Sequence, residues 1–140
     1  MKKNMVRISV IILVLALLLP STAFAMMEAS DYLSYYNAYI TKSGNTIYVN
    51  FDVQGTLIMD YVGVTEIYLY EKTSPSGSWS LVKTFLSSNP AYTSSMIGTY
   101  TNFKDDYVSY SGNSSYQYKA YVTVYAEKDG GSDSRTVTAT

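Results

Sequence analysis

The stretch that decides the fold is Tyr-Gln-Tyr-Lys-Ala-Tyr-Val-Thr-Val-Tyr-Ala, residues 116–126. Its even positions are all aromatic or aliphatic: Tyr116, Tyr118, Ala120, Val122, Val124 and Ala126. Its odd positions are more polar, although they include Tyr121 and Tyr125. Successive side chains of a β-strand point to opposite faces. The stretch is therefore predicted to be a central strand that turns its even positions toward the core.

Two segments upstream show the same alternation. Between residues 46 and 54 an aliphatic or aromatic side chain stands at every odd position: Ile47, Val49, Phe51 and Val53. Between residues 64 and 72, Ile67 and Leu69 alternate with Tyr68 and Tyr70. Alternation of this length is typical of half-buried strands. We expect two separate strands here, with Gly55 ending the first of them.

The remaining sequence predicts shorter strands joined by turns. Strands are expected at residues 37–41, 79–86, 107–111 and 134–139, with turns or loops at residues 42–45, 73–78 and 129–131. The register of residues 79–86 stays open, because a slip of one residue decides whether Trp79 and Leu81 face the core or the solvent. Residues 87–106 are expected to be irregular, with these side chains packed beneath them: Met96, Ile97, Tyr100 and Phe103.

About seven short strands without any helical periodicity define the fold class. Strands that are apolar on one face must bury that face against a second layer. We therefore predict an all-β protein, a single antiparallel β-sandwich over residues 26–140. Its shared core is expected to contain Val49, Phe51, Ile67, Leu69, Tyr118, Val122 and Val124.

The first 25 residues have the composition of a secretory signal peptide. Three basic residues among the first seven precede an apolar run from Ile8 to Leu19, and Ala23-Phe24-Ala25 forms a small-x-small cleavage motif. The run is shorter than the roughly 20 residues of a membrane-spanning helix, so cleavage is favoured over an uncleaved anchor. We expect a secreted, extracellular protein with no membrane partner after cleavage.

Charge and missing residue types restrict the function. Without the three basic residues of the signal, seven basic residues face eleven acidic ones, a net charge of −4. This charge disfavours nucleic acid as a partner. The sequence has no His and no Cys, which excludes Ser-His and Cys-His nucleophile pairs, disulfides, and zinc sites built from imidazole or thiolate. We therefore expect a protein that is not an enzyme.

Acidic residues leave two other chemistries open. A carboxylate pair could act as a hydrolase, and its candidates are Asp52, Asp60, Glu66, Glu71, Asp105 and Asp106. Calcium needs six to eight oxygen ligands, which neither residues 105–106 nor residues 129–133 supply alone. Residues 129–133 are better interpreted as a hairpin turn, so no cofactor and no metal is expected.

From Gly112 onward the chain resembles the end of an immunoglobulin-like or fibronectin type III domain. The matching pattern is Tyr118-x-Ala-x-Val-x-Val-x-Ala126, followed by Gly-Gly-Ser-x-Ser at residues 130–134. In such domains the hydroxyl of a Tyr entering the sixth strand bonds to upstream backbone. The resemblance implies that role for Tyr118, with Tyr116 as the second candidate.

The whole mature chain is also similar to an uncharacterised family of short secreted proteins from Gram-positive anaerobes. The residues that carry this resemblance are Met59-Asp60, Gly63, Ile-Tyr-Leu-Tyr-Glu-Lys at residues 67–72, Trp79 and Ala-Glu-Lys-Asp-Gly-Gly-Ser-Asp-Ser-Arg at residues 126–135. The resemblance implies secretion and a single domain, and it implies no activity.

The tyrosines are the unusual feature, since all sixteen lie beyond residue 25. By alternation four of them face away from the core: Tyr68, Tyr70, Tyr121 and Tyr125. If their strands share a sheet, four rings lie on one outer surface with Trp79 at its edge. Such rings pair across strands on any exposed sheet, but they also suit a binding surface.

Two functions are expected for a protein of this kind. The first is a non-enzymatic binding or adhesion module that uses the tyrosine-rich face for a neutral glycan or a protein. The second is a structural or effector-like secreted protein that acts through its edge strands or loops.

Overall fold

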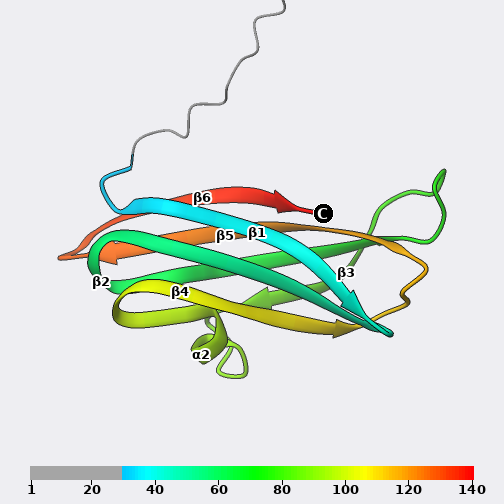
Figure 1. The fold of residues 1–140 in the computed structure, drawn as a ribbon, viewed down its shortest axis with the longest axis horizontal. Helices are drawn as coiled ribbons and strands as arrows, with labels where there is room; N and C mark the ends of the chain where they lie inside the picture. The colour runs from blue at the N-terminus through cyan, green and yellow to red at the C-terminus, as the bar shows by residue number, and fades with distance from the viewer. Residues whose placement is uncertain (1–29) are drawn as a thin grey trace, which may run out of the picture.

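The computed structural model describes residues 30–140, and the predicted signal peptide lies outside this range. Six strands and one short helix follow one another (Figure 1): β1 (Leu33–Ser43), β2 (Thr46–Lys72), β3 (Ser80–Leu86), α2 (Thr93–Met96), β4 (Ile97–Ser111), β5 (Gln117–Lys128) and β6 (Gly131–Ala139). All strand pairs are antiparallel. The all-β antiparallel prediction is confirmed, with six strands in place of about seven.

The difference in strand number comes from β2, which continues through Gly55 where a strand end was predicted. Residues 55–58 of β2 stand opposite Asn102 alone on β4, so β2 bends there. A Cβ atom on Gly55 would lie 2.3 Å from the Cγ of Met59. Gly55 therefore allows the chain to fold back closely on Met59, and the strand turns a corner without stopping.

The bend divides β2 into two halves with different neighbours. Residues 46–54 pair with β1 and β4, whereas residues 61–72 pair with β5, with β4 as far as Gly63 and, near their end, with β3. The register with β5 slips between Val64 and Glu66. This bulge explains why Val62 and Val64 are buried at even positions and Ile67 and Leu69 at odd ones.

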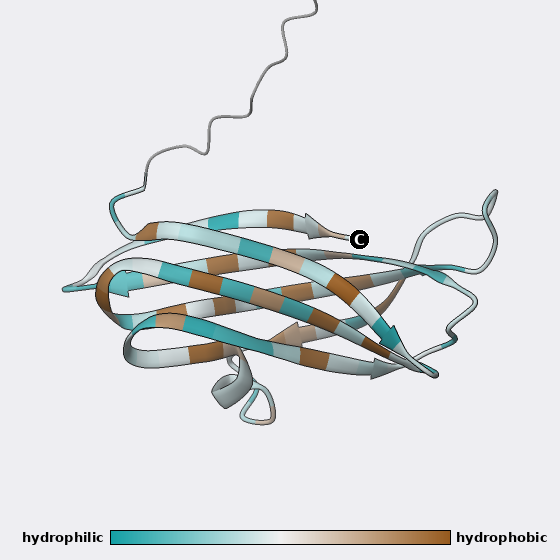
Figure 2. Ribbon diagram, in the orientation of Figure 1, coloured by the Kyte–Doolittle hydropathy of each residue, from teal (hydrophilic) through white to brown (hydrophobic). Residues whose placement is uncertain are grey.

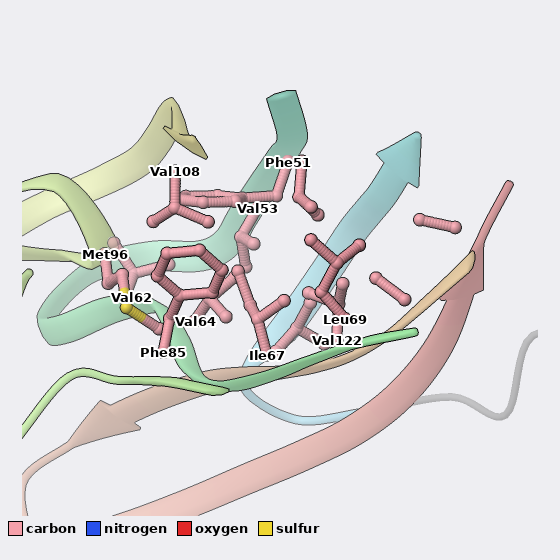
Figure 3. Packing of buried hydrophobic residues seen from close by; sticks show 14 of the residues in the cluster. Phe51, Val53, Val62, Val64, Ile67, Leu69, Phe85, Met96, Val108 and Val122 are labelled. Carbon is pink, nitrogen blue, oxygen red and sulfur yellow. The ribbon is translucent and has the colours of Figure 1, made fainter. Parts of the chain in front are cut away.

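The resulting sheet curls around one core. Its strand order is β1-β2-β5-β6, with β3 and β4 also paired to β2. The outermost strands approach each other, since the Ile40 amide donates to the Thr140 carbonyl at 3.5 Å. Side chains from both halves of β2 meet inside, where Phe51 and Val53 lie above Ile67 and Leu69 (Figure 3).

Apolar and polar residues alternate along the strands, as Figure 2 shows most clearly for β2. All seven side chains predicted to form the shared core are buried: Val49, Phe51, Ile67, Leu69, Tyr118, Val122 and Val124. The register of β3 is also resolved, because Phe85 is buried while Trp79 and Leu81 are exposed. The even positions of β5 face the core as predicted.

The prediction was wrong for residues 97–106, which belong to β4. Met96 is buried as expected, but Tyr100 is 80% exposed and Phe103 is 46% exposed. β4 pairs only with β2 among the described strands, so one of its edges is open. Its outward residues are polar or aromatic, and the apolar alternation that identifies a strand is weak there.

Two local predictions are confirmed at β5. The amide of Asn113 donates to the Tyr118 hydroxyl at 2.8 Å, and that hydroxyl lies 3.1 Å from the Asn113 carbonyl. Gly112 permits this approach, because a Cβ there would lie 2.4 Å from the hydroxyl. At the other end of β5, Asp129 (φ 53°) and Gly130 (φ 80°) form a two-residue hairpin turn.

Candidate functional site

The predicted aromatic surface exists on the outer side of β2 and β5. We call it the lysine face and define it by Tyr68, Tyr70, Trp79, Lys119 and Tyr121. Tyr68 stands opposite Tyr121, and Tyr70 stands opposite Lys119, in the β2–β5 register. The bulge in β2 leaves these rings on the side away from the core. The structure therefore brings together four of the five sequence-predicted residues.

A lysine occupies the centre of this surface. The Lys119 ammonium lies 4.8 Å from the ring centroid of Trp79, 5.3 Å from that of Tyr121 and 5.6 Å from that of Tyr70. The rings of Tyr70 and Tyr121 meet edge to face, with centroids 5.7 Å apart. A cation over an aromatic ring at this range contributes about 0.5–1 kcal/mol at an exposed site. The cluster is thus held together from within the chain.

Trp79 lies at the border of the lysine face and a hollow. At one end of the molecule, on the right in Figure 1, the loop after β2 approaches the end of β1 and the start of β5. A hollow of about 390 Å³ opens there, lined by Ile40, Lys42, Trp79, Gln117, Tyr118 and Thr140. The Lys72 ammonium lies 5.6 Å from the Trp79 ring. The Trp79 indole ring therefore lies near the ammonium groups of Lys72 and Lys119 and also lines a hollow that has both polar and apolar walls.

The fifth predicted residue, Tyr125, lies apart from this cluster. It stands opposite Gly63 on β2 and donates its hydroxyl to Glu127. This hydrogen bond, followed by burial, raises the pKa of Tyr125 above its ordinary value. Tyr125 is therefore committed to a neighbouring carboxylate.

Sequence reasoning missed a second aromatic surface. We call it the aspartate face and define it by Tyr35, Tyr39, Asp52, Phe103, Asp105 and Tyr107. It covers the outer side of β1, the first half of β2 and β4. The signal in the sequence was a period of two in Tyr35, Asn37, Tyr39 and again in Phe103, Asp105, Tyr107. The signal was weak, because Asn37 and Asp105 interrupt the aromatic residues and the spacers Lys104 and Asp106 are not apolar.

The two aspartates of this face stand directly opposite each other. Asp52 on β2 pairs with Asp105 on β4, and their carboxyl groups are close enough to share a hydrogen bond. Burial, then the charge of Asp105, raises the pKa of Asp52. Both were hydrolase candidates, but the two carboxyl groups of a retaining glycosidase stand about 5–5.5 Å apart. Two opposed carboxyl groups on neighbouring strands of an open sheet leave no enclosed site for a sugar ring between them.

The other acidic candidates are engaged elsewhere. Asp60 accepts a hydrogen bond from the Asp129 amide at 2.9 Å, and Lys104 pairs with Asp106 at 2.9 Å. Within residues 30–140, no group of three or more acidic side chains gathers to hold a metal ion. The same part of the chain contains no helix long and apolar enough to cross a membrane.

Comparison with known proteins gives no indication of function, so the inference rests on the residues described above. No protein-family model, curated protein or solved structure matches the chain.

Proposed function

We propose that this protein is a secreted, non-enzymatic binding module whose ligand contacts the lysine face at Trp79. The observation that carries the proposal is the position of Trp79, which is exposed between two ammonium groups and beside a hollow of about 390 Å³. Ligand sites are typically concave, with aromatic walls and a few polar groups. The hollow supplies the concavity, and Lys42 and Gln117 supply the polar groups.

We propose a neutral glycan as the ligand, because the net charge of −4 without the signal disfavours a polyanion. Lys72 and Lys119 repel a cationic ligand from the Trp79 ring. A sugar ring offers a C–H face that stacks on indole and phenol rings, and its hydroxyls accept hydrogen bonds from ammonium groups. A protein that buries the same rings is the alternative ligand.

Secretion belongs to the same proposal and is supported by the signal peptide predicted at residues 1–25. We also assign the curled sheet to the immunoglobulin-like or fibronectin type III-like sandwiches. The hydroxyl of Tyr118 supports that assignment, because it bonds to upstream backbone as the corresponding Tyr does in those domains. The resemblance to short secreted proteins of Gram-positive anaerobes that we infer from residues 59–72 and 126–135 implies the same extracellular location.

A second candidate function uses the strand edges. Among the described strands, β3 and β4 each pair with β2 alone, so each presents one row of unpaired backbone groups. A partner strand can add to such an edge. The open edges of β3 and β4 are therefore the observation that supports a structural or effector-like protein as the second candidate.

Fluorescence tests the first proposal directly, because Trp79 is the chain's single tryptophan. Neutral oligosaccharides from bacterial cell walls are titrated against the protein while its emission is followed. We expect a saturable change, and we expect Trp79→Ala to abolish capture of the same oligosaccharides on an array. Loss of one stacked aromatic ring should weaken binding by about tenfold or more.

The control variant is Tyr100→Asn. It removes the most exposed aromatic ring of the described chain, and Asn tolerates the positive φ (52°) at that position. Equal binding by Trp79→Ala and the wild type, on a folded protein, would contradict the proposal. Binding that survives Trp79→Ala but fails when the edge of β4 is blocked would favour the second function.

A further inference from the structure

The aspartate face is an ordered arrangement of rows across three strands. The β1–β2–β4 register aligns its outward residues as Tyr35–Gln54–Phe103, Asn37–Asp52–Asp105, Tyr39–Asn50–Tyr107 and Thr41–Tyr48–Ser109. Neighbouring rows lie roughly 6.5–7 Å apart. An acidic row is thus flanked on both sides by rows that carry two aromatic rings each.

The rings of these rows are open to solvent. Tyr35, Tyr39, Phe103 and Tyr107 are each 43–51% exposed. At the bend of β2, just beyond the first row, Leu57 and Ile58 are 62% and 63% exposed. Exposed apolar side chains that gather in one area are typical of interaction surfaces.

The face carries negative charge without an internal cation. The rows contain no Lys or Arg. The lysines of β1 and β4 turn elsewhere: Lys42 donates to the carbonyls of Ser114 and Tyr116, and Lys104 donates to Ser94 and Asp106. Like charges directly opposite each other on a sheet are destabilising. The chain therefore holds two aspartates at a cost in stability, where a cation from outside would relieve the repulsion.

We propose that the aspartate face is a docking surface for a protein that presents arginine side chains. A guanidinium group is planar, so it can bond a carboxylate through two N–H groups while it stacks on a phenol ring. The acidic row and its aromatic neighbours supply both partners. Leu57 and Ile58 extend the surface with aliphatic area, which a protein interface buries and a polysaccharide does not. This inference is independent of the glycan proposed for the lysine face.

The experiment measures binding of fluorescent hexa-arginine and hexa-lysine peptides by anisotropy. We expect the wild type to prefer hexa-arginine, because only guanidinium bonds in the bidentate, stacked mode. The double variant Asp52→Asn/Asp105→Asn should bind hexa-arginine about tenfold more weakly or worse, since each lost charge-assisted bond has that order of effect.

The matched control is Asp129→Asn/Asp133→Asn, which removes the same charge from the β5–β6 hairpin, outside the rows of the face. It should change hexa-arginine binding by no more than about twofold, because neither carboxyl group stands between the aromatic rows of the face. An equal loss of hexa-arginine affinity in both double variants would show that binding depends only on the total charge, and it would overturn the proposal. So would equal affinity of the wild type for the two peptides. Tighter binding of an oligo-glucosamine than of hexa-arginine, lost in Asp52→Asn/Asp105→Asn, would replace the protein partner by an amino-sugar chain.

Discussion

The lysine face and the aspartate face both consist of exposed aromatic rings around charged residues, but the charges at their centres have opposite signs. In each, tyrosines pair across neighbouring strands on the outside of β2, edge to face at Tyr70–Tyr121 and at Tyr48–Tyr107. On the lysine face an ammonium lies among the rings and is satisfied by them. On the aspartate face two carboxyl groups meet between the rings and repel each other.

This contrast separates stabilising aromatic pairs from candidate binding surfaces. A ring cluster with its own cation contributes to stability whether or not a ligand is present. A like-charge pair among exposed rings does the opposite. Residues that cost stability without serving the fold are better evidence of function than residues that stabilise it. By that criterion the aspartate face is the more informative of the two, and Trp79 is a candidate only through its exposure beside the hollow.

The largest loss of stability is expected from a substitution in the core that lies beneath both faces. Phe51 lies under the aspartate face, and its side chain packs in the same core as Ile67 and Val122 under the lysine face. Phe51→Ala should lower the free energy of unfolding by about 3–5 kcal/mol, because it leaves a cavity in that core. Denaturant unfolding followed by circular dichroism and by Trp79 fluorescence measures the loss.

The two signals should move together, since one core supports both faces. A loss below about 1 kcal/mol would contradict the burial of Phe51. Unfolding of the rest of the chain with an unchanged Trp79 transition would instead show two independent units.

Much of this shared core could be predicted from the sequence, and the reason is its alternation. Ile47 to Val53 and Tyr118 to Ala126 follow a period of two without interruption, so their inward residues were identified correctly. The bulge after Val64 and the bend at Gly55 depend on contacts with β5 and with Met59, which no local pattern contains. The continuous β2 was therefore missed.

The candidate sites were predictable to different degrees for the same reason. Tyr68, Tyr70 and Tyr121 alternate with buried residues, which marked their face. The cation at its centre, Lys119, was not singled out, because its contacts cross from β5 to the loop before β3. The pairing of Asp52 with Asp105 joins residues 53 positions apart. Only the fold of β4 against β2 creates that pair.

A smaller effect is expected where the chain crosses from one face to the other. Residues 112–116 connect β4 to β5, and the Tyr118 hydroxyl bonds to Asn113 within that connection. Tyr118→Phe should destabilise the protein by about 0.5–1.5 kcal/mol, because the Asn113 amide loses its partner. Equilibrium unfolding in denaturant measures the change.

Tyr121→Phe is the matched control on the lysine face. Its hydroxyl accepts only a long 3.4 Å contact from Lys119, so its removal should change stability little. Equal losses for the two variants would show that the Tyr118 hydroxyl contributes nothing special at the crossing.

The smallest effect has the opposite sign and tests the strain on the aspartate face. Asp52 has a raised pKa in the folded protein, so its charged form is less favourable there than in the unfolded chain. Asp105 is the charged group that faces it, and the flanking rows contain only uncharged residues. At pH 7 we expect Asp52→Asn to stabilise the protein by about 0.2–1 kcal/mol.

The stability gained in Asp52→Asn should depend on pH, because the pKa of Asp52 is raised in the folded protein. This dependence distinguishes Asp52 from Asp106. The gain should be complete above the folded pKa, should shrink as the pH falls through it, and should vanish below the unfolded pKa, where wild-type Asp52 is neutral in both states. Asp106 is paired with Lys104 at 2.9 Å, so Asp106→Asn should lose stability at pH 7. Unfolding curves at pH 7 and pH 3 for both variants measure these signs. A loss for Asp52→Asn at pH 7 would show that the acidic row stabilises the fold, and the distinction between the two faces would then rest on exposure alone.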